Sequence, residues 1–233
     1  MSAPAAGAAR PTVALETSSA RPSVAARLAG RLLERPLAGE RAHASDLLPA
    51  LERTLGDLGV APRDVGAVIV GTGPGSYTGL RVGVATALGL ARGCAAELFG
   101  LSSLEALAWG ELVPGASAAF LLDARQGQLY LARYRRRDDA LETLLAPCVT
   151  TAERLPALLD PSERVFADPA AQRAARLLEA RRREPGRFVD DAAPGAGALL
   201  ELGLLRLARE GPHGPEQVEP LYLRAFAARA RRR

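Results

Sequence analysis

A strand, a glycine-rich loop and a helix follow one another directly in the first half of the chain. Residues 64–70 end in an apolar, β-branched run, which is typical of a strand buried on both faces. The loop at residues 71–79 holds four glycines and a proline, so it cannot continue the strand. Residues 80–91 are good helix formers and are followed by Gly93 as a stop signal. Such a unit is typical of the α/β class.

The segments on either side continue the alternation of strands and helices. Residues 12–15 predict a short strand and residues 97–100 another. Between them, leucines recur at helical spacing over residues 47–58, with Ser45 as the expected N-cap and Gly59 as the expected stop. A further helix is predicted at residues 103–109, capped by Ser102 or Ser103.

One early segment allows two interpretations. Residues 23–28 and 31–37 flank the dipeptide Ala29-Gly30, which could close a β-hairpin. The alanine, leucine and arginine content of both runs suits a helix equally well. The sequence alone leaves this choice open.

The second half begins after Pro114-Gly115, which divides the chain into expected lobes at residues 1–113 and 114–233. The last helix could pack back on the first lobe. The predicted elements are a hairpin at 118–123 and 128–134, helices at 151–159, 172–183 and 194–209, and strands at 164–167 and 220–224. No internal repeat is evident in the sequence. Strands alternating with helices predict an α/β fold with a largely parallel sheet.

The composition predicts a cytoplasmic globular protein. Hydrophobic residues make up 48% of the 233 residues, which is enough for a sizeable core. No apolar run reaches the length of a membrane span, and residues 1–11 lack the apolar run of a signal peptide. Cys94 and Cys148 match neither a metal-ligand spacing nor a disulfide framework, so we expect buried thiols.

The chain contains no lysine, so all thirty of its basic residues are arginine. A Schiff-base nucleophile and the lysine of a P-loop are therefore excluded. The net charge of +4 permits contact with nucleic acid, but the arginines are scattered along the chain instead of forming one block.

The glycine loop is the first candidate site. Its candidate residues are Gly73, Pro74, Gly75, Ser76 and Thr78. A turn of this kind before a helix can hold an anion through backbone N–H groups and the helix dipole. It matches neither the P-loop nor the dinucleotide fingerprint, however, and its glycines could simply permit a tight turn. Both interpretations stay open.

The helix after the loop carries a stripe of small residues. Gly79, Gly83, Ala87 and Ala91 fall at successive i+4 positions on one face. Such a face lets another helix approach closely, which predicts a partner interface. Packing of this helix on the chain's own sheet is the alternative.

Residues suited to catalysis are few. His43 and His213 are the only histidines and lie far apart in the sequence, so a helix with two metal-binding histidines is excluded. Ser76 lies in no nucleophile-elbow motif. The carboxylates that could act in acid–base chemistry show no spacing that singles out a pair; they include Glu16, Asp46, Asp123, Asp190 and Asp191. We expect no metal and no cofactor.

Five motifs in order carry a family resemblance. They are residues 15–19 (LETSS), 41–49 (RAHASDLLP), 73–83 (GPGSYTGLRVG), 122–125 (LDAR) and 219–224 (EPLYLR). Together they resemble the TsaB family of tRNA threonylcarbamoyladenosine biosynthesis proteins. The resemblance implies an α/β, two-lobed actin/Hsp70-like (ribonuclease H-like) fold with mixed sheets flanked by helices.

The same resemblance implies a non-catalytic role. Its members support the TsaD subunit, which transfers threonylcarbamoyl to the adenosine beside the anticodon of tRNAs reading ANN codons, and a TsaE-like ATPase joins the assembly. Contact with tRNA would come through the complex, and a homodimer is possible when the subunit is alone. The alternative is a self-sufficient glycoprotease-like hydrolase or kinase of the same superfamily.

The resemblance also assigns candidate residues. It places the partner interface on helices of the first lobe, which would include Leu80, Val84, His43 and Leu47 beside the small-residue stripe. Glu16, Thr17 and Ser18 correspond to a vestigial phosphate loop. Related proteins usually carry Asp where this chain has Glu16, which makes independent ATP binding less expected.

Overall fold

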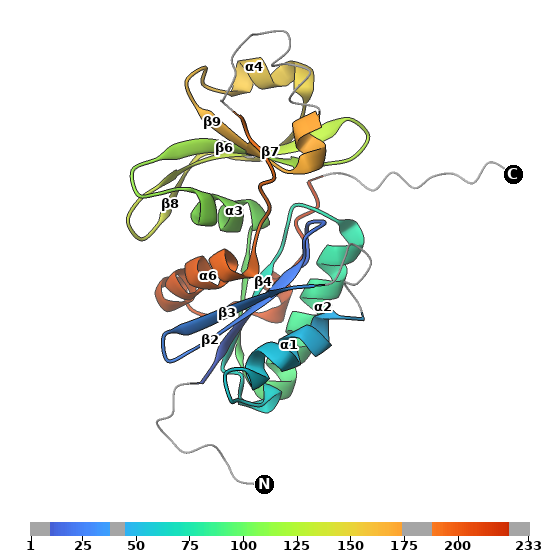
Figure 1. Ribbon diagram of the computed structural model, residues 1–233, viewed down its shortest axis with the longest axis vertical. Coiled ribbons are helices and arrows are strands. Elements are labelled where there is room, and N and C mark those ends of the chain that lie inside the picture. Colours follow the sequence, from blue (N-terminus) through green and yellow to red (C-terminus); the bar gives the residue numbers. More distant parts are fainter. Residues whose placement is uncertain (1–9, 38–44, 174–187, 224–233) are drawn as a thin grey trace, which may run out of the picture.

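The computed structural model describes residues 10–37, 45–173 and 188–223. Two five-stranded sheets lie in separate lobes, with helices between them and on their outer faces (Figure 1). The architecture is a two-lobed α/β fold with mixed sheets flanked by helices, as the family resemblance implies.

The first sheet is built from the first half of the chain. Its strands are β1 (Thr12–Glu16), β2 (Ser23–Leu28), β3 (Arg31–Pro36), β4 (Ala67–Gly71) and β5 (Glu97–Leu101), in the order β3-β2-β1-β4-β5. The ambiguous segment is a β-hairpin, because Ala29 and Gly30 both adopt the positive φ of a two-residue hairpin turn. Strand β1 pairs antiparallel with β2 and parallel with β4.

The second sheet repeats this arrangement. Its strands are β6 (Ser117–Asp123), β7 (Gln128–Arg136), β8 (Leu141–Thr151), β9 (Arg164–Ala167) and β10 (Phe188–Val189), in the order β10-β9-β6-β7-β8. In both sheets the first strand lies at the centre, between an antiparallel and a parallel neighbour. Both sheets are therefore mixed, and the expectation of a largely parallel sheet is wrong. The sequence shows no sign of this repeated topology.

Two helices cover the outer face of the first sheet. Helix α1 (Leu47–Gly56) and helix α2 (Tyr77–Cys94) bury their apolar faces in one cluster with strands β1, β2 and β4. The N-cap of α1 is Asp46, not Ser45. Helix α2 begins three residues before the predicted start, because the Ser76 hydroxyl accepts a hydrogen bond from the Gly79 N–H at 3.2 Å. The short 3-10 helix η1 (Pro62–Asp64) precedes β4.

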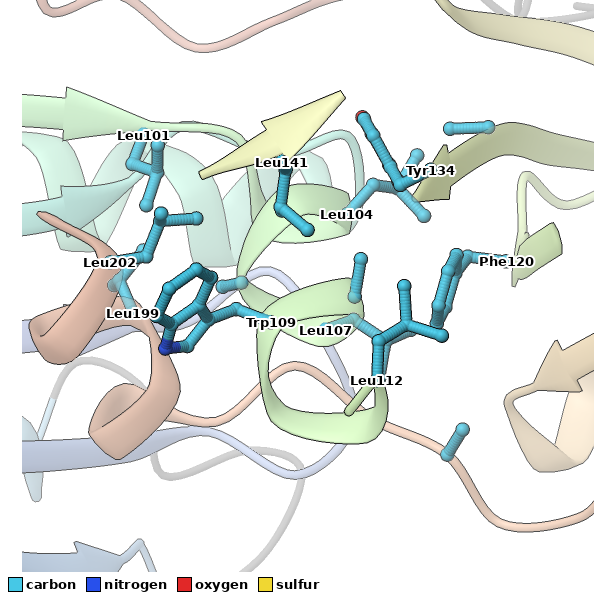
Figure 2. Close-up of a cluster of buried hydrophobic side chains, with 14 of the residues drawn as sticks. Leu101, Leu104, Leu107, Trp109, Leu112, Phe120, Tyr134, Leu141, Leu199 and Leu202 are labelled. Atoms are coloured by element: carbon cyan, nitrogen blue, oxygen red, sulfur yellow. The ribbon is translucent and has the colours of Figure 1, made fainter. Parts of the chain in front are cut away.

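Helices α3 (Ser103–Glu111) and α6 (Ala196–Glu210) form the layer between the sheets. Figure 2 shows apolar side chains of both helices in one cluster, with Trp109 of α3 beside Leu199 of α6, and Leu107 of α3 on the side of Phe120 of β6. Arg206 of α6 forms an ion pair with Glu105 of α3 at 2.6 Å, with both side chains largely buried. This shared cluster connects the two lobes.

The outer face of the second sheet carries the 3-10 helix η2 (Ala152–Arg154) and the short helix α4 (Leu155–Leu158). They replace the single helix predicted at 151–159, since strand β8 extends to Thr151. The predicted helix at 172–183 lies almost wholly outside the described residues. After η3 (Pro215–Gln217), residues 220–223 run in irregular conformation instead of the predicted strand, and Arg224 is outside the described part.

We propose that the lobes divide between residues 113 and 114, where the chain leaves α3 and turns toward β6. Helix α6 belongs to the second half of the sequence and packs against β1, β2, β4 and β5 of the first sheet. Because this helix from the second half completes the core of the first lobe, a cut at the boundary would remove part of that core.

Candidate functional site

Three loops meet at the carboxyl ends of the parallel strands β1, β4 and β5. They are residues 16–18, the glycine loop at 72–76 and residues 102–103 at the start of α3. Ligands of open α/β sheets are usually held at this edge, so it is the first place to look for a site.

Hydrogen bonds within the chain close the glycine loop. The Ser76 N–H donates to the Ser18 carbonyl at 2.7 Å, and the Gly73 N–H donates to the Ser103 hydroxyl at 3.2 Å. The N–H of Gly79 is used by the cap at Ser76. Gly73 and Pro74 are buried, Gly75 and Ser76 are half-buried, and Thr78 is exposed. The N–H groups of Gly73, Ser76 and Gly79 are thus already used within the chain, which favours the tight-turn interpretation over anion binding.

Glu16 is fully buried at the end of β1. Its Oε1 accepts a hydrogen bond from the Ser18 N–H at 2.7 Å, whereas its Oε2 has no hydrogen-bond partner in the structure. A Cβ placed on Gly71 would lie 2.2 Å from this Oε2, so the carboxyl group packs directly against the last residue of β4. Burial raises the pKa of Glu16 more than the nearby polar groups of Ser18 and Ser103 lower it. A fully buried, tightly packed carboxyl group whose pKa is raised is poorly suited to holding metal and phosphate.

Replacing Glu16 by glutamine tests this carboxyl group. Because the pKa is raised in the folded chain, Glu16 favours folding at acid pH and loses that contribution as the pH rises from about 4.5 through the raised value. We expect Glu16→Gln to become progressively more stable relative to the natural chain as the pH rises through that window, with a slope of about 1.4 kcal/mol per pH unit. Urea unfolding from pH 4 to 8 measures the difference, and a difference that stays constant with pH would contradict it.

The small-residue stripe of α2 faces the chain's own sheet. Added Cβ atoms at Gly79 and Gly83 would lie 2.0 Å from the Thr17 carbonyl oxygen and 2.2 Å from Thr17 Oγ1. Ala87 and Ala91 are buried in the core beneath the helix. The interpretation of this stripe as a partner surface is therefore wrong for these four residues, because the two glycines lie against Thr17 and the two alanines are buried in the chain's own core.

The other described residues that were predicted for the interface are buried as well. Leu80 is buried beneath α2 and Leu47 beneath α1, so neither offers a surface to a partner. Val84 is also buried, but it lines part of a groove beside α2. His43 lies outside the described residues. Any partner contact of α1 and α2 must use the opposite, exposed faces of these helices.

Sequence reasoning missed a cluster on the exposed side of α2. The Arg81 guanidinium lies 4.1 Å above the Tyr77 ring, and its Nε donates to the Tyr222 hydroxyl at 3.1 Å. The rings of Tyr77 and Tyr222 are 5.3 Å apart. All three residues occur in the motifs of the family resemblance, which was the available signal, but spacing in the sequence does not show that residues 81 and 222 meet.

Other candidates for chemistry lie apart from one another. His213 stacks on Phe99 at 4.0 Å and accepts a hydrogen bond from the Gly100 N–H. Asp191 pairs with Arg21, and Asp123 accepts a hydrogen bond from the Arg125 N–H at 2.9 Å. Within residues 10–37, 45–173 and 188–223, no three His, Cys, Asp or Glu side chains are grouped to hold a metal ion. In the same part of the chain no helix has the length and apolarity needed to cross a membrane.

Comparison with known sequences identifies relatives in one pathway. The family model described as TsaD, tRNA N6-adenosine threonylcarbamoyltransferase, matches residues 35–182, more than half of the chain. The tRNA threonylcarbamoyladenosine biosynthesis protein TsaB of Escherichia coli is 35% identical over 103 residues, or 43% of this chain and 45% of that protein. TsaB of Bacillus subtilis is 36% identical over 103 residues, with 44% and 45% covered. The chain thus spans about half the length of these curated relatives.

Solved structures extend the similarity over almost the whole chain. A Pseudomonas aeruginosa protein described as similar to the peptidase YeaZ has a TM-score of 0.80 and 29% identity, covering 92% of this chain and all of that one. YeaZ from the same organism has a TM-score of 0.77 and 28% identity, with the same coverage. The chain belongs to the family described as TsaD, tRNA N6-adenosine threonylcarbamoyltransferase, and within it resembles the TsaB proteins.

Proposed function

We propose that this chain is a non-catalytic, cytoplasmic subunit of the complex that forms N6-threonylcarbamoyladenosine beside the anticodon of tRNAs reading ANN codons. Its similarity to proteins named tRNA threonylcarbamoyladenosine biosynthesis protein TsaB supports a role in that pathway. The closure of the glycine loop by the chain's own hydrogen bonds is the observation that carries the non-catalytic part. Since these N–H groups are already used, the loop is better suited to a supporting role than to binding a nucleotide.

The partner in this proposal is a TsaD-like catalytic subunit, bound through the exposed faces of α1 and α2. Large exposed apolar side chains are typical of protein interfaces. Leu48 of α1 is 47% exposed, and Tyr77, Leu221 and Tyr222 are exposed at or beside the start of α2. In the same proposal a TsaE-like ATPase joins the assembly, tRNA is bound through the complex, and the free chain can pair with itself.

Mixing the chain with the TsaD-like subunit of the same genome tests the proposal. Light scattering should show a one-to-one complex, and threonylcarbamoyl transfer should require both proteins. Leu48→Asp should lower the affinity of the complex at least about tenfold, because it replaces an apolar side chain of the interface by a charged one.

The matched control for this experiment is Val113→Asp. Val113 is 69% exposed but lies after α3, away from the outer faces of α1 and α2, so its replacement should leave binding unchanged. Unaided hydrolysis of ATP or of a glycoprotein by the purified chain, lost in Glu16→Ala, would replace the proposal with the hydrolase or kinase alternative.

A further inference from the structure

A shallow groove runs between helix α2 and the segment that follows α6. Its volume is about 540 Å³. Ala85 and Leu88 line it from the helix, and Pro215 and Pro220 line it from the facing segment. Three of the five large apolar side chains exposed on the described residues lie at or near one end of it: Tyr77, Leu221 and Tyr222. The walls are thus suited to apolar side chains.

The facing wall is held to the first sheet by specific hydrogen bonds. The His213 N–H donates to the Leu98 carbonyl of β5, and the Leu221 N–H donates to the Thr72 carbonyl, both at 2.7 Å. Val218 is buried between these two points and contacts the first sheet. The groove is therefore formed before anything binds, which lowers the entropic cost of binding.

Arg81 provides a positively charged group at the end of the groove. The Tyr77 ring beneath it and the Tyr222 hydroxyl beside it fix the guanidinium plane. None of the ion pairs formed among the described residues involves Arg81, so its terminal N–H groups are not used by a carboxylate there. A guanidinium fixed in this way loses little side-chain entropy on pairing with a carboxylate.

The observations favour a protein segment over nucleic acid as the occupant. The groove walls are mainly apolar, and Arg81 is the one cation among the residues that line the groove, which is too little positive charge to follow a phosphate backbone. The face of Tyr77 that a base would need for stacking is already covered by Arg81. A single fixed cation beside apolar walls is instead complementary to an apolar peptide segment that carries one carboxylate.

We propose that this groove binds an apolar segment of the partner protein and that Arg81 forms an ion pair with a carboxylate on that segment. The inference rests on the proposed function, because the segment is expected on the TsaD-like subunit. It adds a second contact to the exposed faces of α1 and α2, namely the groove that residues 81–88 of α2 form jointly with residues 215–222.

Calorimetric titration of the TsaD-like subunit into groove variants tests the inference. Arg81→Glu should lower the affinity at least tenfold, and Leu88→Asp should do the same because it places a charge on the apolar wall. Tyr222→Phe keeps the ring but removes the hydroxyl that orients Arg81, so a smaller loss is expected. Arg63→Glu is the control, since Arg63 is exposed on η1 outside the groove and should bind like the natural chain.

A photocrosslinking residue in place of Ala85 identifies the segment of the TsaD-like subunit that lies in the groove. Replacing the acidic residue of that segment by a basic one should restore binding to the Arg81→Glu variant. If Arg81→Glu and Leu88→Asp bind with natural affinity while Leu48→Asp binds more weakly, the groove is not a binding site. The proposed function would then still stand. Failure of the natural chain to bind would overturn both. Loss of tRNA binding in Arg81→Glu with intact protein binding would show a nucleic-acid surface instead.

Discussion

Alanine at position 83 is expected to destabilise the folded chain by about 1–3 kcal/mol, although alanine ordinarily strengthens a helix. The added Cβ would lie 2.2 Å from Thr17 Oγ1, far inside van der Waals contact. Thr17 is fully buried, and its hydroxyl donates to the Gly79 carbonyl at 2.8 Å, so it cannot move aside without losing that hydrogen bond. Urea unfolding of both proteins measures the loss.

A glycine on the same helix supplies the control. Nothing lies within 4 Å of a Cβ at Gly89, so Gly89→Ala should stabilise the chain by about 0.5–1 kcal/mol. In a Thr17→Ala background, which lacks the obstructing hydroxyl, the cost of Gly83→Ala should shrink markedly. Equal effects at positions 83 and 89 would show that the small-residue stripe is not packed against the loop after β1, and would revive its interpretation as a partner surface.

The sequence predicted the strand, glycine loop and helix around residues 64–94 because their signals are local. A β-branched run, a cluster of glycines and a stretch of good helix formers each act within a few residues. The hairpin of β2 and β3 could not be settled in this way. Its outcome depends on positive φ at Ala29, which a sequence pattern does not reveal for a non-glycine residue.

Which neighbour the small-residue stripe of α2 faces depends on residues that are distant in the sequence. A face of glycine and alanine allows close approach of any neighbour, whether another protein or the chain's own strand. The neighbour here is Thr17, 62 residues before Gly79, and spacing along a helix holds no information about it. The link between Arg81 and Tyr222 spans 141 residues and was beyond sequence reasoning for the same reason.

The repeated topology of the two sheets also left no trace in the sequence. Strand β8 was missed altogether, because its eleven residues mix apolar, polar and charged side chains without clear alternation, and most are only half-buried. In contrast, Glu16 was identified from the sequence as the unusual member of its loop. Its burial and its unpartnered Oε2 were not predictable, because they depend on β4 and α3 lying beside β1.

One arginine fixes the place where α3 ends and the chain turns into the second lobe. Arg136 of β7 donates from Nη1 to the carbonyls of Trp109 and Leu112, at 2.6 and 2.8 Å. Its guanidinium also lies 3.8 Å above the Trp109 ring. The last carbonyls of a helix have no partner within the helix, so this side chain satisfies groups that would otherwise be partly buried and unpaired.

Arg136→Ala is therefore expected to destabilise the chain by about 2–4 kcal/mol, through two charge-assisted hydrogen bonds and one cation–π contact. Arg136→Lys should recover part of this, because an ammonium can reach a carbonyl but lacks the planar stack. Trp109 is the only tryptophan, so its fluorescence follows unfolding and reports the lost contact directly. The neighbouring Arg135, paired with Glu142 at 3.5 Å near the surface, should lose no more than about 0.5 kcal/mol on replacement by alanine. Similar losses at both positions would mean that the end of α3 is held by its apolar contacts alone.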